Sequence, residues 1–186
     1  MKVTRRDLLL LSVLFLAAGA ILVAGHEKSS NGTPMTASAS PPGSHGRVIR
    51  TYEEWKKILT PAQFHVTREK GTETPFSGPN WDNHAPGTYR CVCCDLPLFD
   101  SRAKFDSGTG WPSFWQPTSR DAVLEAGPRS PALVPSGGSV RRVLGAEVLC
   151  ARCDAHLGDV FDDGPKPKGL RYCVNGTALM FIRARE

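Results

Sequence analysis

Six cysteines are the residues of this sequence best suited to chemistry, and four of them form two pairs with the same spacing. Cys91 and Cys94 make the first pair, and Cys150 and Cys153 make the second. Two intervening residues on a tight turn let both thiolates reach one tetrahedral ion, so two such pairs predict a closed four-sulfur zinc site. Disulfide bonds and redox-active pairs are the alternatives for this spacing.

The two cysteine pairs lie far apart in the chain, so a shared zinc ion would join distant segments and contribute to folding. Cys93 lies between the two ligands of the first pair and is surplus to a four-sulfur site. It is either a small structural residue or a spare thiol.

Cys173 has no partner at metal-ligand spacing. It lies in the segment 170–174, which has the length and composition of a β-strand. Alternation along a strand places Arg171 and Asn175 on the same face as Cys173. A nucleophilic cysteine needs positive charge or hydrogen bonds that stabilise its thiolate. By this local pattern alone, a lone cysteine in a strand is more often an inert core residue.

The elements that must position these cysteines are short. Segments with β-strand character are separated by turns rich in Gly, Pro and Ser, and they cover residues 89–92, 140–144, 146–149, 170–174 and 178–182. Residues 51–59 are expected to form a helix capped by Thr51, with Tyr52, Trp55, Ile58 and Leu59 on one face. A second helical turn is expected to begin at Pro61. The pattern predicts a mostly antiparallel β domain over residues 48–186, with short helices at its N-terminal edge.

The chain before this domain has the pattern of a targeting segment. Within residues 1–25, Lys2, Arg5 and Arg6 precede an apolar run, which predicts an export signal similar to a twin-arginine signal. An ordinary export signal and an uncleaved membrane anchor are the alternatives. Residues 26–47 are rich in Ser, Gly, Pro and Thr and are expected to form a flexible linker.

We therefore expect an exported protein, periplasmic or anchored to the outer face of the inner membrane. Contact with the membrane would involve only an uncleaved N-terminal segment. The formal net charge is +5, but no basic run alternates with aromatic residues, so nucleic acid is not an expected partner.

A series of motifs in a fixed order resembles the methionine-R-sulfoxide reductase family, over about residues 50 to 183. The series comprises FHVTR at 64–68, GTETPFSG at 71–78, YRCVCC at 89–94, PLF at 97–99, KFDSGTGWPSF at 104–114, CARCDAHLG at 150–158 and RYCVN at 171–175. The resemblance implies an all-β fold of two antiparallel sheets joined by a structural Zn²⁺ on the four paired cysteines. It also implies reduction of methionine sulfoxide in oxidised proteins or peptides.

The resemblance identifies Cys173 as the nucleophile. Its thiolate attacks the sulfoxide sulfur, receives the oxygen and becomes a sulfenic acid. The sulfoxide oxygen must gain protons as its bond to sulfur breaks, so an acid is required nearby. Trp111 matches the aromatic wall that the family places against the substrate methyl group, although a core tryptophan is the alternative. A thioredoxin-like thiol donor is the expected reductant.

Two departures from the family pattern bear on the mechanism. His156 matches the first histidine of the usual H-L-G-H stretch, but Asp159 replaces the second, so the acid is open: Asp159 with a pKa raised by burial, His156, or a water molecule. Asp159 as an ordinary loop carboxylate is the alternative. Thr109 stands where many members carry a resolving cysteine, so we expect an external dithiol, rather than Cys93, to reduce the sulfenic acid.

Two other functions compete with the reductase. A zinc-binding module that recognises a protein partner without catalysis would have no need of Cys173 flanked by Arg171 and Asn175. A thiol redox sensor would favour a second thiol close to Cys173, which Thr109 does not provide.

Overall fold

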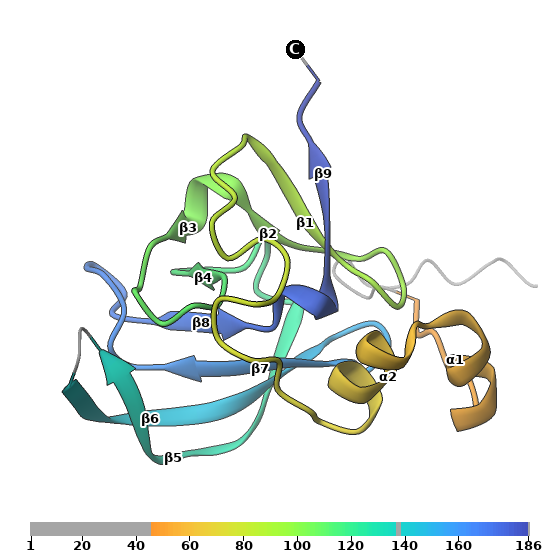
Figure 1. The fold of residues 1–186 in the computed structure, drawn as a ribbon, viewed down its shortest axis with the longest axis horizontal. Coiled ribbons are helices and arrows are strands. Elements are labelled where there is room, and N and C mark those ends of the chain that lie inside the picture. The colour runs from red at the N-terminus through yellow and green to blue at the C-terminus, as the bar shows by residue number, and fades with distance from the viewer. Residues whose placement is uncertain (1–45, 137–138, 186) are drawn as a thin grey trace, which may run out of the picture. The chain divides into compact units, whose positions relative to one another are not determined.

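A computed structural model describes residues 46–136 and 139–185 of the chain. The described part contains two antiparallel β-sheets and two short α-helices (Figure 1). The predicted export signal, and all of the predicted linker except Gly46 and Arg47, lie outside the described residues. Within the described ranges, no helix has the length and apolar character needed to cross a membrane.

The smaller sheet has the strand order β2-β1-β9 and the larger one β3-β4-β8-β7-β6-β5. In chain order, the α-helices (α), 3₁₀ helices (η) and strands (β) are α1 Tyr52–Ile58, α2 Pro61–Arg68, β1 Gly87–Cys91, β2 Pro97–Asp100, η1 Ser101–Ala103, β3 Lys104–Phe105, β4 Ser113–Phe114, β5 Val123–Ser136, β6 Ser139–Cys150, β7 His156–Phe161, β8 Arg171–Val174, η2 Gly176–Ala178 and β9 Leu179–Arg183. The predicted class, mostly β with two antiparallel sheets and short N-terminal helices, is confirmed.

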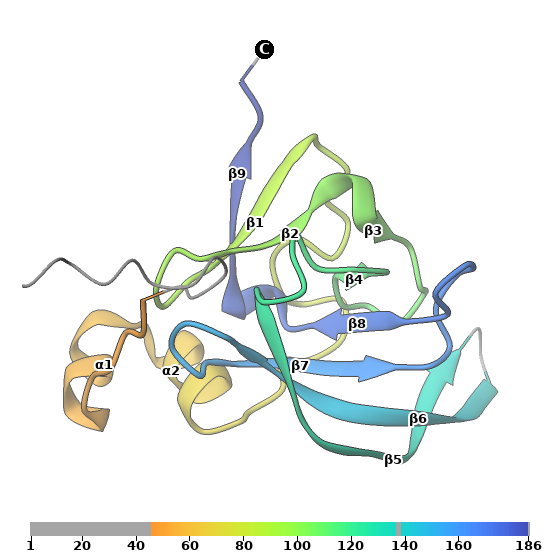
Figure 2. The same ribbon diagram turned by 180° about the vertical axis from the view of Figure 1, so that it is seen from behind.

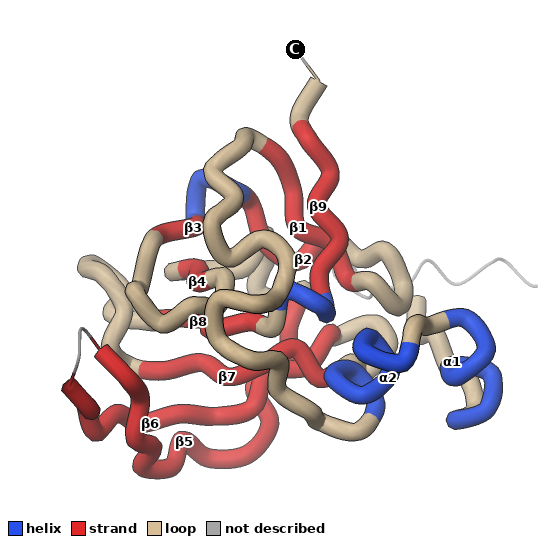
Figure 3. Tube along the Cα trace, in the orientation of Figure 1, coloured by secondary structure: helices blue, strands red, loops and turns tan. Residues whose placement is uncertain are grey.

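Both helices begin at reciprocal caps. The Thr51 hydroxyl accepts from the Glu54 backbone N–H, and the Glu54 carboxylate accepts from the Thr51 N–H. Thr60 and Gln63 repeat this arrangement at the start of α2. Such capping boxes satisfy N–H groups that a short helix cannot bond internally. The predicted helix starts are therefore confirmed. Figure 3 shows both helices beside one end of the larger sheet.

The larger sheet contains strands that the sequence pattern did not predict. The two expected segments 140–144 and 146–149 form one continuous strand, β6, which runs through Gly145. A Cβ atom at Gly145 would lie 2.6 Å from the Phe161 ring, so this glycine allows close packing rather than breaking the strand. Strand β5 contains three prolines, and it is the edge strand of its sheet, where a missing N–H costs no ladder hydrogen bond.

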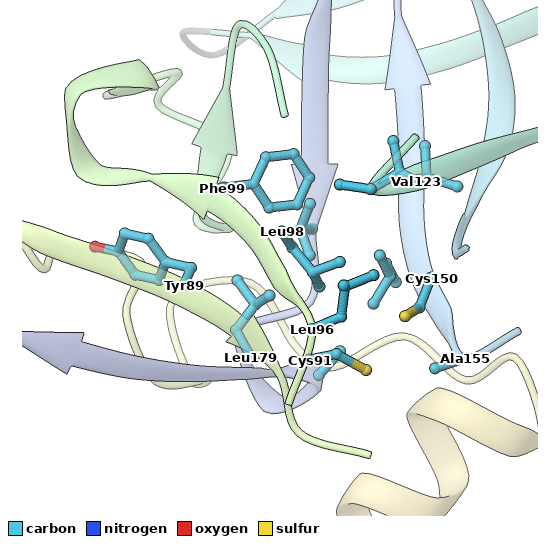
Figure 4. Close-up of a cluster of buried hydrophobic side chains, with 14 of the residues drawn as sticks. Tyr89, Cys91, Leu96, Leu98, Phe99, Val123, Cys150, Ala155 and Leu179 are labelled. Atoms are coloured by element: carbon cyan, nitrogen blue, oxygen red, sulfur yellow. The ribbon is translucent and has the colours of Figure 1, made fainter. Parts of the chain in front are cut away.

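The hydrophobic core draws side chains from both sheets (Figure 4). Tyr89 of β1 and Phe99 of β2 both contact the Phe114 ring of β4, at ring-centroid distances of 5.0 and 4.4 Å. All three rings are fully buried. Burial of these apolar surfaces is the dominant force holding one sheet against the other.

Candidate functional site

The four paired cysteines converge in the structure. All four Sγ atoms lie within 4.8 Å of one another, and the closest contacts join one pair to the other: Cys91 to Cys153 at 3.7 Å and Cys94 to Cys150 at 3.6 Å. A tetrahedral ion with metal–sulfur bonds of about 2.3 Å sets neighbouring sulfurs about 3.8 Å apart, whereas a disulfide needs about 2.05 Å. The cluster therefore fits a bound metal ion rather than disulfide bonds.

Each cysteine pair lies on a turn with the same backbone hydrogen bonds. In the first turn, residues 91–96, the Cys91 N–H donates to Leu96 O and the Asp95 N–H donates to Cys91 O. In the second turn, residues 150–155, Cys150 and Asp154 repeat both bonds. The first turn leaves β1 of the smaller sheet and the second joins β6 to β7 of the larger one. A metal ion held between them would thus join the two sheets (Figure 4).

Arg68 of helix α2 adds a positive charge beside this cluster. Its guanidinium donates to the Cys153 carbonyl at 2.8 Å and lies 3.4 Å from the Cys153 sulfur. The same group stacks on the Trp55 ring at 3.9 Å. Because Arg68 contacts Cys153 without being a metal ligand itself, its positive charge offsets part of the negative charge of a four-thiolate site.

Cys173 lines a cavity of about 180 Å³. Six residues singled out in the sequence line it together: Thr109, Trp111, Asp159, Arg171, Cys173 and Asn175. The other lining residues are Thr72, Leu133, Gly158 and Phe161. Because aromatic and polar groups surround one sulfur, the cavity can hold a small apolar group against Cys173 and a polar atom near Asp159.

The register of the larger sheet places Asp159 beside Cys173. Asp159 of β7 is the direct partner of Cys173 of β8, and Glu147 of β6 is the direct partner of Asp159. Directly paired residues project from the same face of a sheet. Burial raises the pKa of the Asp159 carboxyl, the nearby His156 lowers it, and the Glu147 charge raises it.

The environment of the Cys173 sulfur contains opposing influences. Burial raises the pKa of the thiol, and the Asp159 charge raises it further. The Arg171 charge and hydrogen bonds with Thr109 and Ser113 lower the pKa. The thiolate is therefore formed against the effect of burial, with Arg171 as the largest favourable influence.

Arg171 is held by a residue that the sequence reasoning missed. Its guanidinium donates to the Asp163 carboxylate at 2.8 and 3.0 Å and lies over the Phe161 ring at 4.6 Å. Both members of this ion pair are buried, with side chains only 3% and 7% exposed. Asp163 lies in the connection between β7 and β8, and no spacing rule links an acidic residue there to Arg171.

Trp111 and Asn175 are both fixed by Glu73, another residue that was missed. The Trp111 Nε1–H donates to the Glu73 carbonyl at 3.1 Å, and the Glu73 N–H donates to Asn175 Oδ1 at 3.0 Å. The Glu73 carboxylate accepts from the backbone N–H groups of Gly176 and Thr177 at 2.6 and 2.8 Å. Glu73 lies within the motif 71–78, which was the available signal for it.

His156 lies outside the residues that line the cavity. Its Nδ1 lies 2.8 Å from the Glu147 carboxylate, which also forms an ion pair with Lys70 at 2.8 Å. The geometry therefore favours Asp159 over His156 as the group near the Cys173 sulfur. The assignment of His156 as a catalytic acid stays a prediction.

Comparison with known proteins adds independent observations. The family model described as SelR domain matches residues 59–183. The chain is 51% identical over 133 residues to "Peptide methionine sulfoxide reductase MsrB" of Pseudomonas entomophila, covering 72% of this chain and 94% of that protein. It is 52% identical over 136 residues to the protein of the same name from Thioalkalivibrio sulfidiphilus, covering 73% and 92%.

A plant protein is equally similar. "Peptide methionine sulfoxide reductase B1, chloroplastic" of Arabidopsis thaliana is 52% identical over 132 residues, which cover 68% of this chain and 57% of that longer protein. The match extends from helix α2 through β9 and includes both cysteine turns and the strand of Cys173. Identities of about one half across this whole span establish that the chain belongs to the methionine-R-sulfoxide reductase family.

Proposed function

We propose that this protein is an oxidoreductase that reduces the R epimer of methionine sulfoxide in oxidised proteins and peptides. The observation that carries the proposal is the position of Cys173, which lines one cavity with Trp111, Asp159 and Arg171. A binding module would not require a reactive thiol placed against a charged pair and an aromatic wall. The family relationship supports the same conclusion.

The reaction begins with attack of the Cys173 thiolate on the sulfoxide sulfur. The sulfur–oxygen bond of the substrate breaks and a new sulfur–oxygen bond forms on Cys173, which becomes a sulfenic acid, while methionine is released. The substrate sulfur is reduced by two electrons and the cysteine sulfur is oxidised by two. Arg171, fixed by Asp163, stabilises the thiolate before attack.

Asp159 is the group that we assign as the acid. Burial raises the pKa of its carboxyl, which favours the protonated form that a proton donor requires. Its cross-strand pairing with Cys173 places it next to the attacking sulfur. It delivers a proton to the sulfoxide oxygen as negative charge develops there.

Trp111 provides the wall against which the substrate methyl group packs. Its indole N–H is occupied by the Glu73 carbonyl, so the ring presents carbon atoms to the cavity. An apolar wall on one side and a proton donor on the other distinguish the two epimers, because only one places its methyl and its oxygen correctly at the same time.

An external thiol donor regenerates Cys173. One donor thiol attacks the sulfenic acid and releases water, and a second thiol then resolves the mixed disulfide. Thr109 stands beside Cys173 and has no thiol. Cys93 packs with the core around the metal-binding turns, whereas Cys173 packs against the separate cluster of Val143 and Phe161. A thioredoxin-like protein has the required dithiol chemistry.

We further propose that the metal held by Cys91, Cys94, Cys150 and Cys153 is Zn²⁺ with a structural role. Four sulfur ligands in a closed tetrahedron suit this ion and leave no open position for substrate. When bound, the ion supplies a crosslink between the two sheets. All chemical steps above use only the residues around Cys173.

The test is a stereospecific assay with a small dithiol as reductant. The wild-type protein should reduce the R epimer of a methionine sulfoxide peptide, and Cys173→Ser should have no activity. Asp159→Asn should lower kcat/KM by roughly 10²- to 10⁴-fold, because the amide cannot supply the proton, while Asp159→His, which restores the usual family residue, should retain activity. Full activity of Cys173→Ser would refute the mechanism.

Export and a periplasmic or membrane-anchored location stay predictions, because the segment that carries the signal lies outside the described residues. They are consistent with the zinc proposal: a twin-arginine route carries folded proteins, so the metal site could form in the reducing cytoplasm.

A further inference from the structure

Three hydroxyl groups connect the Cys173 sulfur to the backbone carbonyl of Trp111. Thr109 Oγ1 lies 3.9 Å from Cys173 Sγ, within the longer reach of sulfur, and 2.8 Å from Ser107 Oγ. Ser107 Oγ lies 2.7 Å from Ser113 Oγ, which donates to Trp111 O at 3.3 Å. Thr109 and Ser113 are buried. We refer to Ser107, Thr109 and Ser113 as the hydroxyl chain.

The number of protons sets the direction of the hydroxyl chain. Ser113 also forms a hydrogen bond with the Cys173 sulfur, so the hydroxyl chain has five contacts but only three protons of its own, because each hydroxyl carries one and the Trp111 carbonyl only accepts. When Cys173 is a thiol, its S–H supplies the fourth proton, and every group donates toward Trp111. The four contacts from the sulfur through Thr109, Ser107 and Ser113 to the carbonyl are then hydrogen bonds, and the Ser113–sulfur contact is without a proton.

Ionisation of Cys173 removes one of the four protons and turns the sulfur into a strong acceptor. Thr109 and Ser113 then donate to the thiolate, and Ser107 donates to Thr109. The contact from Ser113 to Trp111 O is left without a proton. At 3.3 Å it is the longest of the three oxygen–oxygen contacts, so it is the weakest bond to give up.

We propose that the hydroxyl chain is a relay that reverses its direction when Cys173 ionises, donating to the thiolate and releasing the Trp111 carbonyl. The three hydroxyl groups rotate and keep their own protons. The only proton that leaves is that of Cys173, which passes to solvent. Thr109 and Ser113 contact the reacting sulfur, whereas Ser107 is a positioning residue.

The relay deepens the proposed function, on which it rests, because it concerns the same thiol. A hydrogen bond to a thiolate is stronger than one between neutral groups, and a hydroxyl that itself accepts a hydrogen bond is a better donor. Burial raises the pKa of the Cys173 thiol, and this arrangement acts in the opposite direction. A cysteine in place of Thr109 would break the chain, so the device depends on the residue that distinguishes this protein from members with a resolving cysteine.

The experiment follows the Trp111 carbonyl by NMR in protein labelled with ¹³C at the tryptophan carbonyls. The signal is assigned by its absence in Trp111→Phe. As pH rises, the Trp111 signal should move to higher field with the same midpoint as the alkylation of Cys173 by iodoacetamide, measured by mass spectrometry on the peptide that contains it. Cys173→Ser should show no such step.

Ser113→Ala is the decisive variant, because Ser113 is the hydroxyl that leaves the Trp111 carbonyl when Cys173 ionises. The relay predicts that the carbonyl step disappears while Cys173 still ionises. Thr109→Val should raise the alkylation midpoint by about one pH unit, and the carbonyl step should move with it. Thr109→Ser, which keeps the hydroxyl, should preserve both properties and controls for a change in fold.

Two outcomes would overturn the relay: no carbonyl step in the wild type, or a full step that persists in Ser113→Ala and so reports only the field of the thiolate. Neither readout requires turnover. A failure of the relay can therefore be distinguished from a failure of the reductase proposal, which the peptide assay tests separately.

Discussion

Asp159 and Cys173 are paired across β7 and β8, and burial raises the pKa of both groups. Burial has opposite consequences for their roles, because it favours the protonated acid but disfavours the thiolate. Arg171, held by Asp163, lies next to Cys173 and offsets this effect at the sulfur. One sheet face therefore holds the proposed proton donor and the proposed nucleophile in neighbouring positions.

The raised pKa of Asp159 predicts a pH-dependent effect on stability. The folded protein binds this proton more tightly than the unfolded chain, so the associated stability is fully present below the unfolded pKa and is lost as pH rises through the folded pKa. Asp159→Asn removes a buried charge at neutral pH. Its melting temperature at about pH 7 should therefore exceed that of the wild type, and the difference should shrink at about pH 3.

Thermal unfolding followed by circular dichroism at the two pH values measures this difference. Glu147→Gln is a useful companion, because the Glu147 charge contributes to raising the Asp159 pKa. An Asp159→Asn variant that melts below the wild type at neutral pH would show instead that the carboxylate is stabilised in the folded state.

The residues on β8 were predictable because alternation along a strand fixes which side chains share a face. Arg171 and Cys173 do line one cavity. The residues that hold the site in place were not predictable in the same way. Asp163, in the β7–β8 connection, binds Arg171, and Glu73, in the segment before β1, binds Asn175. Only the tertiary fold determines those contacts.

At the scale of elements, the segment 71–78 connects Trp111 to the end of β8. Glu73 carries this connection with both its backbone and its carboxylate, which accepts from Gly176 and Thr177 of the η2 turn. The turn begins three residues after Cys173, so Trp111 and Cys173 are positioned relative to each other by one residue.

Glu73→Gln should loosen this connection. The amide keeps one acceptor oxygen but turns an N–H₂ group toward a backbone N–H, which should cost roughly 1–3 kcal/mol of stability. We expect KM for the peptide substrate to rise more than kcat falls, because the wall shifts but the thiol remains. Steady-state kinetics and the Cys173 alkylation rate, which should be unchanged, measure the two effects. An unchanged KM would contradict the positioning role.

The strands that escaped prediction have physical explanations. Strand β5 contains Pro128, Pro131 and Pro135, which are unfavourable inside a sheet, but an edge strand tolerates residues without an N–H. Strand β7 contains Gly158, a residue that is unfavourable within a strand. A Cβ atom there would lie 2.1 Å from the Cys173 carbonyl, so glycine is required where β7 closely approaches β8. In both cases the explanation depends on which strands lie alongside, and the local sequence does not show this.

At the scale of the whole molecule, the metal-binding turns are where the two sheets meet. Figure 2 shows β1 and β9 of the smaller sheet rising from the end of the larger sheet near helix α2. The Arg68 side chain connects that helix to Cys153. Loss of the metal is therefore expected to weaken the contact between the sheets and the attachment of the helices together.

Cys91→Ser and Cys93→Ser make a matched pair of variants for this expectation. Elemental analysis should find one zinc ion per wild-type chain, none in Cys91→Ser and one in Cys93→Ser. Cys91→Ser should unfold at a much lower temperature, because binding of a structural zinc contributes several kcal/mol or more to folding. A fully folded, metal-free wild type would contradict the structural role of the ion.

The pairing of β1 with β9 has a consequence for how the chain folds during synthesis. Residues 87–91 pair with residues 179–183, so the smaller sheet cannot close until almost the entire domain has left the ribosome. Contacts between such distant segments form slowly, because a long loop must be ordered before they are gained. Until then, β1 exposes an edge of unpaired backbone N–H and C=O groups that can associate with other chains. We therefore expect truncation before β9 to yield aggregated chains rather than a smaller folded domain.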